Sequence, residues 1–177
     1  MAAARLKMFF RSRRWIAGWV GAGAGLAGLL LWPFSPALEI VDGRAGRVVL
    51  CARVQESETF VLSFTHSVNR RPVYDTFRVE SDHLVIVKSR FDAFGAGMPE
   101  ASTNEGTLSV TDGSWLEWVV NRPVPEVTVR VGRVADHTLH LKGREIHLSD
   151  LSEPGSPLAL RVRKIRWLDI MKGRCIP

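Results

Sequence analysis

His66 and Asp75 are the two residues whose types and positions could carry acid–base chemistry. Both lie in runs of alternating polarity, 59–67 and 73–80, in which every second side chain shares one face of a strand. His66 falls in the aromatic and aliphatic row of its run, and Asp75 falls in the apolar row of the next. If residues 69–72 form a four-residue hairpin loop, the two side chains oppose each other with Cβ atoms about 5 Å apart. The sequence therefore predicts a His66–Asp75 pair on the inner face of a sheet.

This pair has two interpretations. It either satisfies two buried polar groups by a hydrogen bond, or lines a pocket in which His66 binds a ligand or acts as a base oriented by Asp75. Ser67 points to the face opposite His66, which disfavours a serine–histidine dyad. Tyr74 lies on the polar face of its run. No catalytic residue is assigned, and the candidate binding residues here are His66, Ser67, Tyr74 and Asp75.

A second candidate site is the glycine-rich loop after the run 83–91. Gly95 and Gly97 let the backbone adopt positive φ and turn amide groups outward, a geometry that can cradle an anion. Arg90 supplies a bidentate partner for a carboxylate or phosphate. No helical pattern follows the glycines, which excludes a dinucleotide or phosphate-binding loop. The candidate binding residues here are Arg90, Phe91, Gly95 and Gly97; the alternative is an ordinary wide turn between strands.

The histidines and cysteines do not show the spacing of a metal site. His137 and His140 point to opposite faces of an alternating run, so the two nearest histidines diverge, and neither a metal nor a cofactor is expected. Cys51 lies in an apolar run and Cys175 lies near the end of the chain. The sequence leaves open whether they form a disulfide, which an oxidising compartment would permit.

Strands must position these residues, because polarity alternates with a period of two after residue 38 and turn residues recur about every ten positions. Asp112-Gly113 and Lys142-Gly143 mark hairpins. The pattern indicates an all-β fold, either an antiparallel sandwich or a partly closed barrel. Nine runs are predicted as strands: 46–54, 59–67, 73–80, 83–91, 106–112, 114–121, 126–132, 137–143 and 158–163.

The N-terminal segment predicts a membrane anchor. Residues 15–32 form an uncharged run long enough, at about 1.5 Å per residue, to approach the roughly 30 Å hydrocarbon core of a bilayer. Residues 1–14 hold five basic and no acidic residues, which places the N-terminus in the cytoplasm and the remainder outside it. The alternative is a signal peptide cut before Leu38, after the small residues Ser35 and Ala37. Both alternatives export the rest of the chain.

The charge is distributed in agreement with this topology. Of the formal net charge of +6, residues 1–37 contribute +5 (five basic, none acidic) and residues 38–177 contribute +1 (19 basic minus 18 acidic). The basic balance is thus a topology signal, and no nucleic acid partner is expected. The predicted organisation is a cytoplasmic basic segment 1–14, a transmembrane helix 15–32, a linker 33–37 and an extracytoplasmic β domain 38–177.

The C-terminal segment is the second basic region. Residues 158–177 hold six basic residues and one acidic residue. Alternation in 158–163 places the basic side chains on a solvent face. The other interpretation is an electrostatic contact with anionic lipid headgroups or an acidic partner.

Several strings of the chain resemble the domain of unknown function 1850 family. The resemblance covers most of residues 45–163 and leaves out the apolar N-terminal segment. It implies a bacterial protein that accompanies TAXI-type TRAP transporters, which import organic acids with a periplasmic solute-binding protein. The family has no established activity, so no catalytic role is carried over. The strings are Thr65-His66-Ser67-Val68, Pro72–Phe77, Arg90-Phe91, Phe94–Pro99 and Asp136–Leu139.

Three functions follow as expectations. The preferred one is a single-pass bacterial inner-membrane protein, with its C-terminal domain in the periplasm, that assists a TAXI-type TRAP carboxylate importer by binding protein or a small anion. Its expected partners are the transporter membrane subunit or the solute-binding protein, and its expected ligand is a small carboxylate. The second is an envelope interaction module without a ligand. The third is a small hydrolase or isomerase using His66 and Asp75; no enzymatic activity is expected under the first two.

Overall fold

The computed structural model describes residues 23, 25, 27–111 and 113–176. The described residues fall into two compact units. The larger comprises residues 35–164 with 175–176, and the smaller comprises those of 23–34 with 165–174. All the candidate site residues belong to the larger unit.

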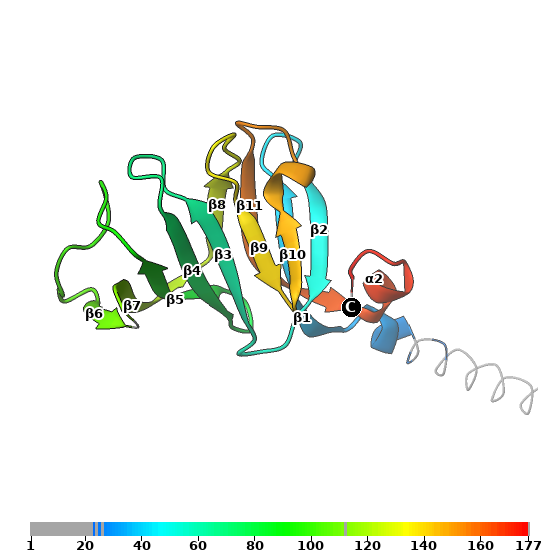
Figure 1. The fold of residues 1–177 in the computed structure, drawn as a ribbon. Coiled ribbons are helices and arrows are strands. Elements are labelled where there is room, and N and C mark those ends of the chain that lie inside the picture. Colours follow the sequence, from blue (N-terminus) through cyan, green and yellow to red (C-terminus); the bar gives the residue numbers. More distant parts are fainter. Residues whose placement is uncertain (1–22, 24, 26, 112, 177) are drawn as a thin grey trace, which may run out of the picture. The chain divides into compact units, whose positions relative to one another are not determined.

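The larger unit contains a seven-stranded antiparallel sheet (Figure 1). Residues Thr, Val and Phe, which favour pleated and half-buried surfaces, are frequent in its strands. Between β9 and β10, Lys142 and Gly143 have φ values of 52° and 71°, the positive pair that a two-residue hairpin turn requires. In spatial order the strands are β10 (Arg144–His147), β9 (Thr138–Leu141), β3 (Thr59–Thr65), β4 (Pro72–Val79), β5 (Leu84–Phe91), β7 (Trp115–Val124) and β6 (Thr107–Thr111).

A four-stranded sheet completes the β structure. The chain passes from the larger sheet to this one at Pro125, between β7 and β8, where a residue without an N–H donor interrupts the ladder. A short 3₁₀ helix, η1 (Leu148–Asp150), follows β10. In spatial order the strands are β2 (Arg47–Arg53), β1 (Pro33–Asp42), β11 (Pro157–Arg166) and β8 (Glu126–Arg130).

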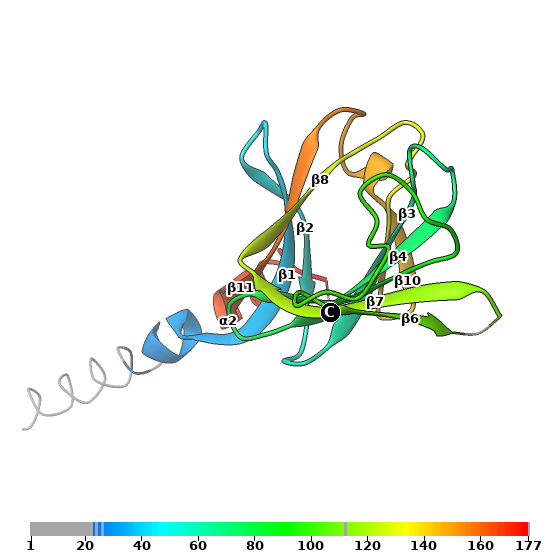
Figure 2. The same cartoon turned by 90° about the vertical axis from the view of Figure 1, so that its left-hand side faces the viewer.

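The two sheets pack face to face over one apolar core (Figure 2). Phe60 of β3 stacks on Phe77 of β4 with ring centroids 5.2 Å apart, and both are buried. Leu38 and Leu158 of the smaller sheet belong to the same cluster. The prediction of an antiparallel two-sheet fold is confirmed, and the described strands do not close into a barrel.

A second, smaller cluster lies on the same inner face of the larger sheet. Val73, Phe91 and Leu116 form its buried centre, and Met98 and Trp118 pack against it. Because the smaller sheet has only four strands, the β5–β7–β6 end of the larger sheet relies on its own loop residues, such as Met98, for this cover. In Figure 1 this end lies away from β1 and β2.

The N-terminal strand and the C-terminal helix differ from the sequence prediction. The linker expected at 33–37 is wrong, because β1 begins at Pro33 and is flanked by β2 and β11. The Pro36 carbonyl accepts a hydrogen bond from the Val54 N–H at 3.2 Å. Proline has no N–H donor, so it contributes to the strand pairing through its carbonyl group. The sequence also gave no sign of helix α2 (Trp167–Met171).

The predicted transmembrane helix at 15–32 lies largely outside the described residues, and the segment 1–14 lies wholly outside them. Residues 27–31 are helical. Within the described part of the chain, no helix has both the length and the apolar character needed to cross a bilayer.

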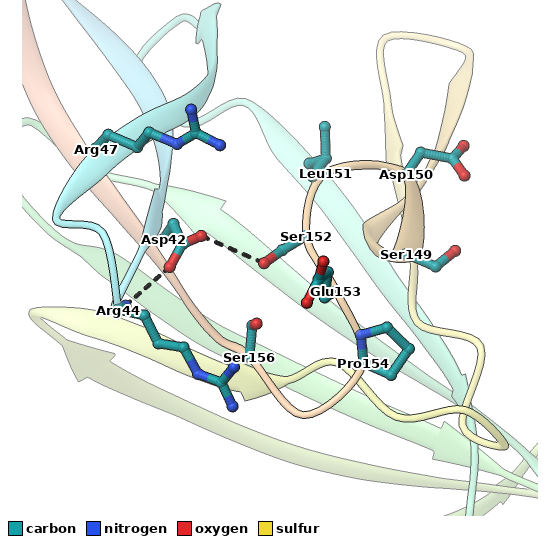
Figure 3. Close-up of a pocket in the computed structure, with 10 residues that line it drawn as sticks. All are labelled: Asp42, Arg44, Arg47, Ser149, Asp150, Leu151, Ser152, Glu153, Pro154 and Ser156. Atoms are coloured by element: carbon teal, nitrogen blue, oxygen red, sulfur yellow. Dashed lines mark hydrogen bonds between the residues drawn. The ribbon is translucent and has the colours of Figure 1, made fainter.

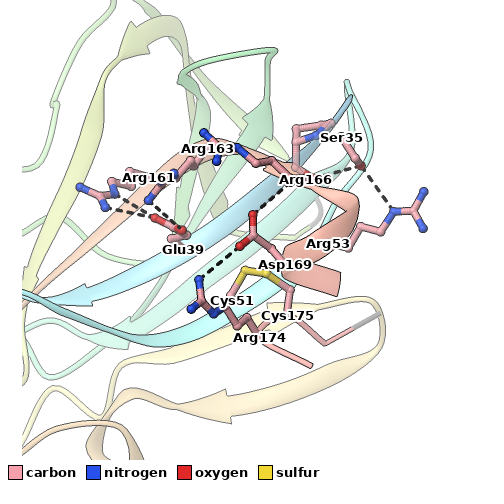
Figure 4. The surroundings of a disulfide bond; sticks show 11 residues. Ser35, Glu39, Cys51, Arg53, Arg161, Arg163, Arg166, Asp169, Arg174 and Cys175 are labelled. Carbon is pink, nitrogen blue, oxygen red and sulfur yellow. Dashed lines mark hydrogen bonds and ion pairs between the residues drawn. A yellow bond between two sulfur atoms is a disulfide. The ribbon is translucent and has the colours of Figure 1, made fainter. Parts of the chain in front are cut away.

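Cys51 and Cys175 form a disulfide, which resolves the alternative that the sequence left open (Figure 4). The bridge joins β2 to the C-terminal end across a sequence separation of 124 residues. Beyond it, Ile176 pairs in parallel with Ala52, and its N–H donates to the Cys51 carbonyl at 2.8 Å. Ile176 therefore extends the edge of the smaller sheet.

Glu39 of β1 neutralises part of the basic C-terminal strand. Its carboxylate accepts hydrogen bonds from the Arg161 guanidinium, with the closer contact at 3.1 Å, and lies 3.8 Å from Arg163 (Figure 4). Glu39 is 6% exposed, so its charge requires these partners. The basic solvent face predicted for 158–163 is thus partly an internal ion-pair network.

Candidate functional site

The outer face of the larger sheet, which points away from the core, carries a group of polar and charged side chains. Strand alternation sends Val73, Asp75 and Phe77 inward and Tyr74 and Thr76 outward, as the sequence predicted.

The register between neighbouring strands aligns outward residues across the sheet. Ser63 pairs with Tyr74, Tyr74 with Arg90, and Arg90 with Glu117. A parallel row aligns Val61, Thr76, Lys88 and Val119.

These rows enclose an outer concavity of about 430 Å³. Arg90 lies over the Trp115 ring, with its Cζ 4.8 Å from the centroid, and Tyr74 packs against the same ring at 5.8 Å. Lys88 donates to the Glu117 carboxylate at 2.7 Å. The concavity therefore combines Arg90 and the Glu117-paired Lys88 with aromatic walls, which suits a carboxylate attached to an apolar group. Its lining residues are Val61, Tyr74, Thr76, Lys88, Arg90 and Trp115.

A hydroxyl, an imidazole and a carboxylate line up beside this concavity. Ser63 Oγ lies 2.7 Å from His140 Nε2, and His140 Nδ1 lies 3.5 Å from Glu145 Oε1. The order resembles a nucleophile, a base and an orienting acid. These three side chains extend the polar surface beside the outer concavity.

The predicted His66–Asp75 pair is wrong, because β3 and β4 pair in another register. Asp75 lies opposite Leu62, and Phe60 lies opposite Phe77. The ladder ends at Thr65 and Pro72, so the hairpin loop contains six residues rather than four. The shift moves each residue by an even number of positions, which preserves the inward and outward faces while separating the two side chains along the strand.

His66 instead joins two loops. Its Nδ1 accepts from the Val68 N–H at 3.3 Å, which leaves Nε2 protonated to donate to the Ala96 carbonyl, also at 3.3 Å. Gly95 lies against this ring, because a Cβ there would come within 2.9 Å of His66 Cε1 and of Asn69 Nδ2. The glycine is needed for close approach of the loops, and His66 acts here as a structural connector.

Further contacts fix the same two loops. Asn69 donates to the Phe94 carbonyl at 3.0 Å, and Arg71 forms a two-point ion pair with Asp92, with Nε–Oδ1 at 2.9 Å. The Arg71 guanidinium holds the pKa of the Asp92 carboxyl below its usual range. Gly97 has φ of 84°, the left-handed conformation that glycine adopts readily. Ser67 is exposed in the turn. The Phe94 and Ala96 carbonyls thus bond to the β3–β4 loop, which agrees with the alternative of an ordinary wide turn.

Asp75 is a half-buried carboxyl on the inner face. The Ser89 hydroxyl of β5 donates to its Oδ1 at 2.5 Å, as the pairing of Asp75 with Ser89 requires. Burial raises the pKa of Asp75, and the Ser89 hydrogen bond opposes part of this effect. Asp75 is therefore a buried polar group that is satisfied by a hydrogen bond, as in the first of the two interpretations. Its partner is Ser89 rather than His66.

We expect Asp75→Asn to stabilise the domain at neutral pH. A raised pKa in the folded state means that folding disfavours the ionised carboxyl, so stability is lost as pH rises through that pKa. The amide keeps an acceptor for Ser89 and carries no charge. The gain in the free energy of unfolding should be present near pH 7 and vanish below about pH 4, where the carboxyl is protonated in both states. Urea unfolding of the full chain in detergent at both pH values measures it.

The matched control is Glu100→Gln, which removes one exposed carboxylate from a loop. It should leave the free energy of unfolding nearly unchanged at both pH values. A loss of stability in Asp75→Asn at neutral pH would contradict the burial argument.

The remaining candidate residues separate into different environments. Arg90 and Tyr74 line the outer concavity. Phe91, predicted as a binding residue, is instead fully buried in the second core cluster and meets the Phe94 ring edge-on at 6.2 Å. His137 tilts over Phe64 at 5.4 Å, and burial lowers the pKa of its imidazole. The eight predicted residues therefore do not converge on one cavity.

A second concavity, of about 530 Å³, lies between the β1–β2 turn and the loop after η1 (Figure 3). Asp42 accepts from the Arg44 and Ala45 backbone N–H groups at 2.8 and 3.1 Å, and these bonds lower the pKa of its carboxyl. Arg44 donates to the Gly155 carbonyl at 3.1 Å. The Ser152 hydroxyl donates to Asp42 at 3.4 Å, and together with the Arg44–Gly155 bond this contact joins the two loops.

Sequence reasoning missed Lys88 and Trp115 of the outer concavity. Lys88 and Arg90 are two apart in one strand, so alternation already placed them on the same face. Trp115 lies at the start of the next strand of the sheet, and only the β5–β7 register brings it to Arg90. Among the described residues, no group of three or more His, Cys, Asp or Glu side chains is placed to hold a metal ion.

These features define a small antiparallel β domain whose larger sheet carries a polar concavity on its outer face. The family model of the domain of unknown function (DUF1850) matches residues 60–148, just over half of the 177 residues. The chain belongs to this family. The match begins within β3 and ends just after β10, so it contains the whole seven-stranded sheet except Thr59. Comparisons with curated proteins and with solved structures gave no match.

Proposed function

We propose that the chain is a membrane-anchored extracytoplasmic accessory protein of a TAXI-type TRAP carboxylate importer, and that it binds its partner or a small carboxylate through the outer concavity. The observation that supports this proposal is that Lys88 and Arg90 lie beside Tyr74 and Trp115, all within residues 60–148, which the family model matches. The proposed partner is the transporter membrane subunit or its solute-binding protein.

Two features support the proposed location in the bacterial inner membrane with the β domain in the periplasm. The apolar run 15–32 follows a basic segment, the order typical of an anchor whose C-terminal side is exported. The Cys51–Cys175 disulfide suits an oxidising compartment such as the periplasm. Cleavage before Leu38 would give the same compartment without the anchor.

The chemistry of the concavity favours a carboxylate-bearing group. The planar Arg90 guanidinium lies above an aromatic ring, and the ammonium of Lys88, two residues away, is paired with Glu117. An Asp, Glu or C-terminal carboxylate of a protein partner presents the same group as a small organic acid. The alternative of an envelope module without a ligand predicts that substituting Lys88 or Arg90 changes no binding. The hydrolase or isomerase alternative was argued from a His66–Asp75 pair, and the β3–β4 register does not bring these two side chains together.

Photocrosslinking in native membranes tests the protein partner. A benzophenone amino acid replacing Tyr74 should form an adduct with the transporter membrane subunit or the solute-binding protein. The same group replacing Val110, which is 72% exposed on β6, should not. Charge reversal by Lys88→Glu with Arg90→Glu should abolish the adduct, whereas Arg133→Glu with Lys142→Glu, at exposed loop positions outside the concavity, should leave it intact.

Titration of the purified full chain with succinate tests the small carboxylate. The fluorescence of Trp115 should change with saturation, and Trp115→Phe should remove that change. Arg90→Gln should weaken binding by about tenfold or more, because a hydrogen bond to a charged group contributes about 1.5–3 kcal/mol. If neither the adduct nor the titration depends on Lys88 and Arg90, the concavity is not the binding site and the proposal fails.

A further inference from the structure

The smaller unit exposes an unusual number of large apolar side chains for its size. Trp32 and Met171 are about seven-tenths exposed, at 70% and 71%, and Trp167 is 43% exposed. None of the residues of α2 is buried. Leu29 and Leu31, in the last helical turn before Trp32, are exposed as well. An exposed apolar cluster of this kind marks a surface that is covered by something else.

Internal contacts order this surface. The Phe34 and Trp167 rings stack with centroids 4.4 Å apart and planes 13° from parallel. Asp169 caps α2 by accepting from the Arg166 N–H at 3.2 Å, and its other oxygen binds Arg174 at 3.3 Å. The segment that follows the apolar run and the C-terminal helix are thus joined by a ring stack, and α2 has a defined end at each terminus.

The charged residues of the same segment are mainly basic. Arg166, Lys172 and Arg174 are exposed, and Asp169 is the one acidic residue of 165–174, so this stretch carries three basic minus one acidic charge, +2. The basic groups flank α2 at both ends, next to Trp167 and Met171. Aromatic, aliphatic and cationic side chains in one short segment are typical of a membrane interface, where rings enter the headgroup layer and cations meet lipid phosphates.

We infer that α2 and residues 32–34, at the start of β1, lie in the headgroup layer of an anionic bilayer, as a second membrane contact beside the anchor. This inference rests on the proposed anchor at 15–32, which would leave the membrane at Trp32. Phe34 is two residues further, at most about 7 Å along an extended chain. Since Trp167 stacks directly on Phe34, it lies at the same depth.

The bilayer fits this surface better than a protein partner does. A five-residue helix buries too little area on its own to hold a protein, whereas a lipid surface covers any exposed apolar group that reaches it. The positive charge of the segment complements anionic lipid headgroups. The sequence left two interpretations of the basic residues in 158–177, a solvent face and a lipid contact. Arg161 forms an ion pair with Glu39. Under the present inference, the basic residues around α2 contact the lipid headgroups.

Depth-dependent quenching tests the inference on the full chain, reconstituted in vesicles of phosphatidylethanolamine and phosphatidylglycerol. A bimane label at Met171→Cys should lose most of its fluorescence to a lipid carrying a nitroxide near its headgroup and little to aqueous iodide. The matched control is Val110→Cys, equally exposed on β6 of the larger unit, for which iodide should quench and the lipid should not. Labelling under non-reducing conditions keeps Cys51 and Cys175 paired.

Two further readouts separate the causes of failure. Lys172→Glu should lower the lipid quenching at position 171 if charge contributes, and no change would overturn the electrostatic part of the inference. Alkaline carbonate extraction reports on the anchor: release of the chain would overturn the anchor and this inference together. A chain that resists extraction while position 171 is quenched by iodide as strongly as position 110 would overturn this inference alone and leave the proposed function standing.

Discussion

Replacing both cysteines, by Cys51→Ala with Cys175→Ala, should lower the free energy of unfolding by about 2–5 kcal/mol. The disulfide closes a loop across 124 residues, so its loss returns a large amount of chain entropy to the unfolded state. It also frees Ile176, whose backbone bonds to Cys51 and Arg53 complete the edge of β2. Urea unfolding of the full chain, followed by circular dichroism, measures the change.

The reductant provides the control for this prediction. Dithiothreitol should shift the unfolding midpoint of the wild-type chain by about the same amount as the double substitution, and should not shift the double variant further. Equal midpoints for the oxidised, reduced and substituted chains would contradict a stabilising role. Such a result would also weaken the argument that the chain is built for an oxidising compartment.

Phe91→Ala should be the most damaging single substitution among the predicted site residues. Its ring is 0% exposed and lies with Val73 and Leu116 at the centre of the second core cluster. Deleting a buried phenylalanine ring leaves a cavity and costs about 3–5 kcal/mol. The loss should appear in urea unfolding, and the outer concavity should lose ligand binding only as far as the domain unfolds.

Phe94→Ala is the matched control. Its ring meets Phe91 edge-on, but it is 48% exposed, so its removal exposes no comparable cavity. We expect a cost of about 1 kcal/mol or less. If the two variants were equally destabilised, the second cluster would not be the core of this end of the sheet.

Local pattern was sufficient to predict nine of the strands and their faces, but not β1 or β10, because side-chain alternation depends only on neighbouring residues. Tyr74 and Asp75 point to the opposite faces that the alternation assigned to them. The helix α2 had no such signal, because five residues show less than two turns of periodicity. The strand β1 was hidden for a related reason: its two prolines suggested a linker, and its ladder partners lie in other parts of the chain.

The site was less predictable because it depends on register and on long-range pairing. The His66–Asp75 hypothesis required one hairpin loop length, and the actual loop is two residues longer. Even so, Tyr74 and Arg90 were found, because both are outward residues and the β4–β5 register places them side by side. Trp115 required the position of β7, which nothing within that strand specifies.

The strand order of the smaller sheet has a kinetic consequence. It places β1 (Pro33–Asp42) beside β11 (Pro157–Arg166), so the smaller sheet stays incomplete until residues 157–166 are available. Contacts between such distant segments form slowly, because the chain must lose the entropy of closing a long loop before these contacts stabilise it. If the chain is exported, as proposed, the smaller sheet can be completed only after residues 157–166 have crossed the membrane.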